Sequence, residues 1–129
     1  MYSLVNNIEA YPEFLPWCTS AAVFDRTDSR LTASVSLATG KIKQTFTTEN
    51  TMQPGKQIDV TLISGPFSHL NGRWKFQDAG NNLCQIDLQM DFEFRNKLLK
   101  LTLGPVFNQF MSKLVGSFIK RAELVYGRQ

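Results

Sequence analysis

The fold is decided by the stretch Cys84-Gln-Ile-Asp-Leu-Gln-Met-Asp-Phe-Glu-Phe94, in which apolar and polar side chains alternate strictly. Successive side chains of a β-strand point to opposite faces, so the stretch predicts a strand with one apolar and one wet face. The apolar face needs a cover. A later segment can supply it, because apolar residues recur at helical spacing from Val106 to Tyr126.

The same two-residue period extends backwards from this strand over residues 19–95. Short connections between strands predict an antiparallel meander. At Asn71-Gly72 the apolar alternation continues, so we expect a bulge at Gly72 rather than a turn. Turn-forming residues divide the stretch into about six strands at Thr27–Arg30, Gly40, Gln53–Lys56, Gly65-Pro66 and Ala79–Asn82.

Helices are predicted at both ends of the chain. Residues 1–8 have apolar side chains at helical spacing, and the aromatic, proline-rich segment Tyr11–Trp17 suits a short turn against the core. A short helix over 97–103 should precede Gly104-Pro105, which marks a kink or a fresh helix start. The whole pattern predicts an α+β fold, with a curved antiparallel sheet packed on a long C-terminal helix.

Composition is typical of one folded domain over residues 1–129. Apolar residues make up 43% of the chain and charged residues 19%, which argues against a disordered protein. The sequence contains no apolar run long enough to span a membrane and no secretory signal, so we expect a cytoplasmic protein. Cys18 and Cys84 form no CxxC pair, and we interpret both as reduced, largely buried thiols.

Charge is distributed unevenly along the chain. Residues 1–94 contain 7 basic and 10 acidic side chains, whereas residues 95–129 contain 7 basic side chains and Glu123 alone. This basic end is consistent with contact to an anionic surface, either lipid headgroups or nucleic acid. A solvated helix face explains the same pattern equally well, because lysine and arginine are favoured near a helix C-terminus.

No catalytic site is indicated. His69, the single histidine, is predicted to point outward without an obvious partner, so neither a nucleophilic triad nor a metal site is expected. Asp87, Asp91 and Glu93 share one strand face with glutamines, and we interpret them as solvated. The remaining candidate site is the apolar space between sheet and helix, which a plain closed core would explain as well.

Several motifs resemble the coenzyme Q-binding START-like family of the polyketide cyclase superfamily, and together they cover essentially the whole chain. The most specific are the opening Met1-Tyr-Ser-Leu-Val-Asn-Asn-Ile-Glu-Ala-Tyr-Pro-Glu-Phe-Leu-Pro-Trp-Cys18 and Gly65-Pro-Phe67. Further matches are Leu70 with Gly72-Arg-Trp74, Phe92-Glu-Phe94, Gly104-Pro-Val-Phe107 and Phe118-Ile-Lys-Arg-Ala122.

The resemblance implies a helix-grip (START-like, Bet v 1-like) fold. Its cavity is expected to bind a polyprenyl quinone or similar lipid, most simply ubiquinone, and to support respiration without being an enzyme. A polyketide cyclase on the same fold is a weaker interpretation, because it would need an inward-facing acid-base pair. On this hypothesis the ligand contacts Val35, Leu37, Phe46, Val60, Leu62, Phe67, Leu70, Trp74, Phe92, Phe107, Phe110, Met111, Leu114 and Phe118.

For bacterial members the resemblance implies an alternative role, that of a toxin that binds the large ribosomal subunit and blocks its joining to the small one. The expected contacts to ribosome or membrane are Lys97, Lys100, Lys113, Lys120 and Arg121. An antitoxin protein is a further expected partner, as is transient contact with the surface of the inner membrane.

Members of this family begin with a β-strand before the first helix, whereas the present sequence starts inside that helix. We therefore expect the first strand of the sheet to be absent, which exposes a sheet edge. The lack of a mitochondrial-type transit segment favours a bacterial protein.

Overall fold

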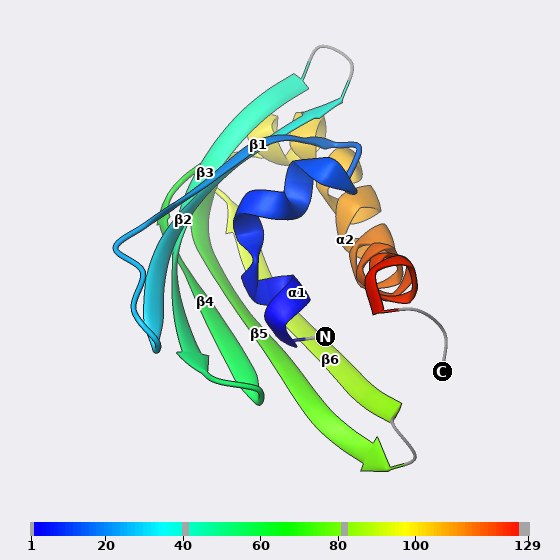
Figure 1. Ribbon diagram of the computed structural model, residues 1–129. Coiled ribbons are helices and arrows are strands. Elements are labelled where there is room, and N and C mark those ends of the chain that lie inside the picture. Colours follow the sequence, from blue (N-terminus) through cyan, green and yellow to red (C-terminus); the bar gives the residue numbers. More distant parts are fainter. Residues whose placement is uncertain (1, 40–41, 81–82, 127–129) are drawn as a thin grey trace.

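The predicted strands form one antiparallel meander, in which each strand pairs with the next along the chain. This arrangement is seen in a computed structural model, which describes residues 2–39, 42–80 and 83–126. Figure 1 shows the sheet curving around the helices, which lie on its concave face. The strands are β1 (Cys18–Phe24), β2 (Arg30–Thr39), β3 (Ile42–Gln53), β4 (Gln57–Ser64), β5 (Phe67–Gly80) and β6 (Leu83–Phe94).

The helical elements are α1 (Tyr2–Asn6), the 3-10 helix η1 (Ile8–Glu13) and α2 (Lys97–Tyr126). Asn96 caps α2, because its side-chain oxygen accepts a hydrogen bond of 2.9 Å from the Leu99 backbone N–H. The separate short helix and fresh start predicted around Gly104-Pro105 are wrong, since one helix of 30 residues continues through Pro105. Packing of the apolar side of α2 against the sheet outweighs the local cost of the proline.

The bulge predicted at Gly72 is also wrong. Pairing of β5 with β6 is regular there, with Gly72 opposite Met90, and its register shifts instead between Phe67 and His69 and near Gly80. Because one extra residue reverses the alternation of faces, the shift after Phe67 places both Phe67 and Leu70 in the core.

Two glycines lie in close contact with neighbouring residues. A Cβ atom added at Gly72 would lie 2.8 Å from the Cε atom of Met90, so Gly72 makes room for the methionine on the paired strand. Gly65 has a φ of +156°, and a Cβ atom there would lie 2.8 Å from the Cβ atom of Phe46. The Gly65-Pro66 turn can therefore pack directly on β3.

The core lies between the concave face of the sheet and the helices. Phe118 of α2 is 1% exposed and makes edge-to-face contacts with Tyr11, Phe14 and Trp74, at centroid distances of 5.2, 5.2 and 5.4 Å. Burial of a side chain of this kind contributes about 1.5–3 kcal/mol. Phe118 thus joins α2, η1 and the sheet.

Some sequence features lie outside the described residues, namely Gly40, Asn81-Asn82, Arg128 and the side chain of Cys84. Cys18 is buried and free, as predicted. Within the described residues, no helix is long and apolar enough to cross a membrane.

Candidate functional site

A cavity of about 120 Å³ lies between the concave face of the sheet, α2 and the N-terminal segment. An engineered cavity of about 150 Å³ is known to hold one benzene molecule, so this space suits one ring or about one isoprene unit. Its lining consists of Val5, Ile8, Tyr11, Leu15, Trp17, Cys18, Ala33, Val35, Leu37, Phe46, Thr48, Asn50, Val60, Leu70, Trp74, Met90, Phe107, Phe110, Met111, Leu114 and Phe118.

Most of the ligand contacts predicted from the sequence line this cavity, but three do not. Leu62 and Phe92 pack beside the buried cluster of Phe67, Leu70, Phe107 and Phe110. Phe67 stacks on Phe94 at a centroid distance of 4.9 Å. The predicted residues that line the cavity are Val35, Leu37, Phe46, Val60, Leu70, Trp74, Phe107, Phe110, Met111, Leu114 and Phe118.

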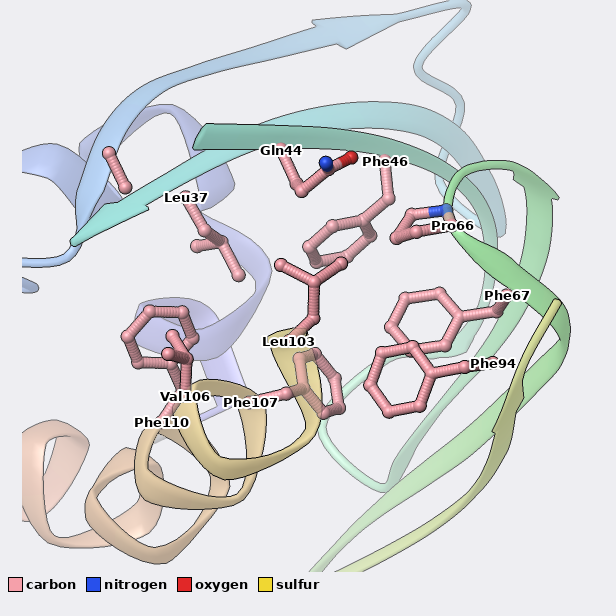
Figure 2. A pocket seen from close by; sticks show the side chains of 11 residues that line it. Leu37, Gln44, Phe46, Pro66, Phe67, Phe94, Leu103, Val106, Phe107 and Phe110 are labelled. Atoms are coloured by element: carbon pink, nitrogen blue, oxygen red, sulfur yellow. The ribbon is translucent and has the colours of Figure 1, made fainter. Parts of the chain in front are cut away.

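Phe67 instead lines a smaller side pocket of about 30 Å³ beside the first turns of α2. Figure 2 shows the rings of Phe46, Phe67, Phe94 and Phe107 and the side chain of Leu103 converging on this space. The side pocket shares Leu37, Phe46, Phe107 and Phe110 with the cavity. The two spaces are therefore adjacent.

The N-terminal segment contributes cavity walls that the strand pattern did not reveal. Trp17 stacks on Phe110 of α2 at 5.4 Å, and the Tyr11 hydroxyl donates a hydrogen bond to the Val5 carbonyl. These contacts depend on how η1 packs across the sheet, and this packing leaves no periodic pattern in the sequence. The available signal was the aromatic, proline-rich composition of residues 11–17.

Thr48 and Asn50 are the polar members of the lining that sequence reasoning missed. Both are on β3 and are buried, and the Thr48 hydroxyl donates a hydrogen bond of 2.9 Å to the Asn50 side-chain oxygen. Thr48 and Asn50 point to the same face of β3 as Phe46 and Met52. The sequence alone therefore indicates two polar residues on an apolar face.

Titratable groups in the cavity wall are neutral at physiological pH. Burial raises the pKa of Tyr11 above its ordinary value, and it raises the pKa of Cys18 to about 11. Among the described residues, the lining contains no lysine, arginine, aspartate, glutamate or histidine. The cavity therefore offers no charge to compensate a charged ligand.

The four predicted contact lysines of α2, Lys97, Lys100, Lys113 and Lys120, are all exposed. None takes part in the ion pairs formed within the described parts of the chain. Lys113 and Lys120 are seven residues apart and share one side of α2, about 10 Å from each other along the axis. Lys97 and Lys100 line a separate polar groove between β6 and α2.

Arg121 is held differently from these lysines. One of its terminal nitrogens lies 3.1 Å from a carboxylate oxygen of Glu13, and its guanidinium lies 5.2 Å from the centre of the Phe14 ring. The side chain is 26% exposed. Arg121 therefore fastens α2 to η1 and is a poor candidate for contact with a partner.

His69 faces outward as predicted, but it does have a partner. Its Nε2 atom lies 3.5 Å from a carboxylate oxygen of Asp91, and the two side chains are 42% and 83% exposed. Among the described residues, no group of histidine, cysteine, aspartate and glutamate is arranged to hold a metal ion. Asp87, Asp91 and Glu93 are exposed on the wet face of β6.

The sequence profile of the family described as "Polyketide cyclase / dehydrase and lipid transport" matches residues 1–119. The chain belongs to this family. The family assignment confirms the resemblance drawn from the motifs and agrees with the helix-grip architecture.

Two relatives of this chain have names that state a function. The "Ribosome association toxin RatA" of Pseudomonas aeruginosa is 40% identical over 127 residues, which cover 98% of this chain and 88% of that protein. The "Coenzyme Q-binding protein COQ10 homolog B, mitochondrial" of Xenopus laevis is 26% identical over 133 residues, which cover all of this chain and 54% of that protein.

The fold is also shared with a solved aromatase/cyclase. The crystal structure of the Zhui aromatase/cyclase from Streptomyces sp. R1128 superimposes with a TM-score of 0.83, covering 95% of this chain and 84% of that one. The sequence identity is 14%, so this likeness concerns the fold alone.

Proposed function

We propose that this chain is a ribosome association protein of the toxin type, which binds the large ribosomal subunit and hinders its joining to the small one. The observation that carries the proposal is the 40% identity to a ribosome association toxin across 98% of the chain. The relative named as a coenzyme Q-binding protein is more distant, at 26% identity. The toxin reading is therefore the better supported of the two.

The exposed lysines of α2 support this proposal, because ribosomal RNA presents a dense array of phosphates. Lys113 and Lys120 face solvent on one side of the helix and have no described ion-pair partner. Their ammonium groups remain available for phosphate contacts, whereas Arg121 is occupied by Glu13. Lys97 and Lys100, in the separate groove at the start of α2, offer a second pair of exposed ammonium groups.

The test is a sucrose-gradient profile of ribosomes after addition of the purified chain. Free subunits should increase at the expense of whole ribosomes, and the large-subunit fraction should contain the chain. The variant Lys113→Glu/Lys120→Glu should lose this effect. Lys43→Glu/Lys56→Glu is the matched control, since Lys43 on β3 and Lys56 in the β3–β4 turn are both exposed and the change in charge is the same.

Binding through phosphate contacts should also weaken steeply with salt, and the slope should decrease in Lys113→Glu/Lys120→Glu. An unchanged ribosome profile on addition of the wild-type chain would refute the toxin role. Equal loss of activity in both double variants would show that net charge matters and that α2 is not the contact surface.

We further propose that the cavity holds a neutral, largely apolar molecule, with the ring of an isoprenoid quinone such as ubiquinone as the candidate. The apolar lining and the volume of about 120 Å³ support a ring-sized occupant. An isoprenoid tail would extend toward the side pocket next to Phe67 and Leu103. This role is non-enzymatic, because it uses only burial and hydrogen bonding.

Native mass spectrometry of the purified chain, followed by organic extraction, tests the cavity proposal. A co-purified quinone or other neutral lipid, released on unfolding, is the expected result. Recovery of empty protein that also fails to bind added ubiquinone in titration would refute it, without affecting the ribosome proposal.

A further inference from the structure

Two polar side chains interrupt the apolar inner face of the sheet. Thr48 and Asn50 are 5% and 6% exposed, and both line the cavity. Buried polar groups cost free energy unless they are hydrogen-bonded, so an apolar face rarely contains them without a reason. Their cross-strand neighbours are all apolar, namely Leu31, Ala33, Val60 and Leu62.

The hydrogen bond between the two side chains leaves donors unused. Thr48 donates to the side-chain oxygen of Asn50, and no acceptor among the described residues takes a hydrogen bond from the Asn50 Nδ2 atom. In the described chain, the fully buried side-chain atoms that lack a hydrogen-bond partner are Asn6 Oδ1 and Arg121 Nε. The Asn50 Nδ2 atom is not one of them, so it retains some accessible surface. The open space that Asn50 reaches is the cavity that it lines.

The surroundings restrict what could accept these hydrogen bonds. The part of the cavity wall that the structure describes contains no charged side chain, and burial keeps Tyr11 and Cys18 in their neutral forms by raising the pKa of each. A carboxylate or ammonium group in the cavity would therefore lose its hydration without gaining an opposite charge. A neutral acceptor such as a carbonyl oxygen incurs no such cost.

We propose that Asn50, oriented by Thr48, is the recognition group of the cavity and donates a hydrogen bond to a neutral carbonyl-type oxygen of a ring-sized ligand. This inference rests on the proposed role of the cavity as a ligand site. Sites built around a buried donor reject analogues that lack the acceptor, because the donor is then left unpaired. The pair thus selects carbonyl compounds over hydrocarbons of the same shape.

The test uses three small probes with the ¹⁵N-labelled full chain: acetophenone, ethylbenzene and benzoate. Acetophenone and ethylbenzene have similar size, but only the first has a carbonyl. Titration followed by NMR should shift the Asn50 side-chain amide signals with acetophenone and leave them nearly unchanged with ethylbenzene. We expect acetophenone to bind about fivefold more tightly, which corresponds to one net neutral hydrogen bond. Benzoate should not bind.

Two variants separate recognition from packing. Asn50→Leu keeps a side chain of similar size without donors, so its affinity for acetophenone should fall to that for ethylbenzene. Thr48→Val removes the hydroxyl that orients Asn50 but retains the Asn50 donors, so it should reduce the preference for acetophenone without abolishing it. If Asn50→Leu does not fold, the wild-type amide signals and the wild-type affinity ratio still decide the matter.

Equal affinities of the wild-type chain for acetophenone and ethylbenzene would overturn the recognition role and leave the cavity proposal standing. Binding of acetophenone without a shift of the Asn50 amide signals would do the same. Failure of the wild-type chain to bind any of the probes, or ubiquinone, would overturn both proposals together.

Discussion

Arg121 lies where α2 passes η1, with its guanidinium over the Phe14 ring and 3.1 Å from Glu13. Cation–π contacts and packing of the arginine stem contribute more here than the exposed ion pair. We expect Arg121→Gln to lower the free energy of unfolding by about 1 kcal/mol. Glu13→Gln should cost less than about 0.5 kcal/mol, because the Glu13 side chain is 63% exposed. Urea denaturation measures both values.

The same variant tests the assignment of contact residues. Ribosome binding should survive Arg121→Gln, since the native guanidinium is already engaged within the fold. A loss of binding as large as that of Lys113→Glu/Lys120→Glu, without a change in stability, would contradict the role of Arg121 as an internal fastener.

Cys18 should give the stability of the protein a specific dependence on alkaline pH. Burial raises the pKa of its thiol from 9.0 to about 11. Because the folded state favours the protonated thiol, the contribution of Cys18 to the free energy of unfolding is fully present below pH 9.0 and is lost as the pH rises toward about 11. The melting temperature of the wild type should therefore fall more steeply over this range than that of Cys18→Ala. Parallel pH curves for the two proteins would contradict the prediction.

At the scale of the elements, the strands could be predicted from the sequence because turn-forming residues interrupt a strict alternation. The paired positions of β5 and β6 could not all be predicted. Phe67 and Leu70 have opposite parity, and only the register shift before His69 explains why both are buried. Register depends on pairing with another strand, so it has no signature within β5 itself.

The cavity was predicted only in part for a related reason. The predicted ligand contacts on α2 and the strands followed from the periodicity of the sequence, and most of these residues line the cavity. The contributions of Tyr11 and Trp17 depend on tertiary packing of a non-periodic segment. The alternation along β3 places Thr48 and Asn50 on the inner face of the sheet, but an apolar pattern predicts only apolar lining residues.

Met111 belongs to the part of α2 that lines the cavity, and its side chain is only half-buried. Met111→Trp should place an indole in the space of about 120 Å³ and compete with the ligand. Enlarging a side chain in a tight core costs about 1–3 kcal/mol, whereas growth into existing space should cost less. We expect loss of quinone binding with little change in melting temperature.

Leu124→Trp is the matched control, because Leu124 is on the same helix and is 74% exposed. It should change neither ligand binding nor stability. If Met111→Trp unfolds the protein, or binds ubiquinone as well as the wild type does, then the ligand does not occupy the space beneath Met111.

At the scale of the whole molecule, α2 separates the two proposed activities. Its inner side, with Met111, Leu114 and Phe118, lines the cavity, whereas Lys113 and Lys120 are exposed. Phe118 and Arg121 fix the helix to the sheet and to η1. A helix held in this way can present both surfaces without moving, and Figure 1 shows it lying along the concave face.

Because allosteric coupling requires a ligand to distinguish two states of the protein, a fixed α2 predicts independent binding. Met111→Trp should lose quinone binding and still release free subunits in the gradient, while Lys113→Glu/Lys120→Glu should show the reverse. Saturation of the wild-type chain with ubiquinone should change its affinity for the large ribosomal subunit by less than about twofold, well below the 5–150-fold range of typical allosteric coupling. A larger change in either direction would mean that the cavity and the basic surface are linked through a movement of α2. In that event the two variants would no longer separate the activities, and each would impair both.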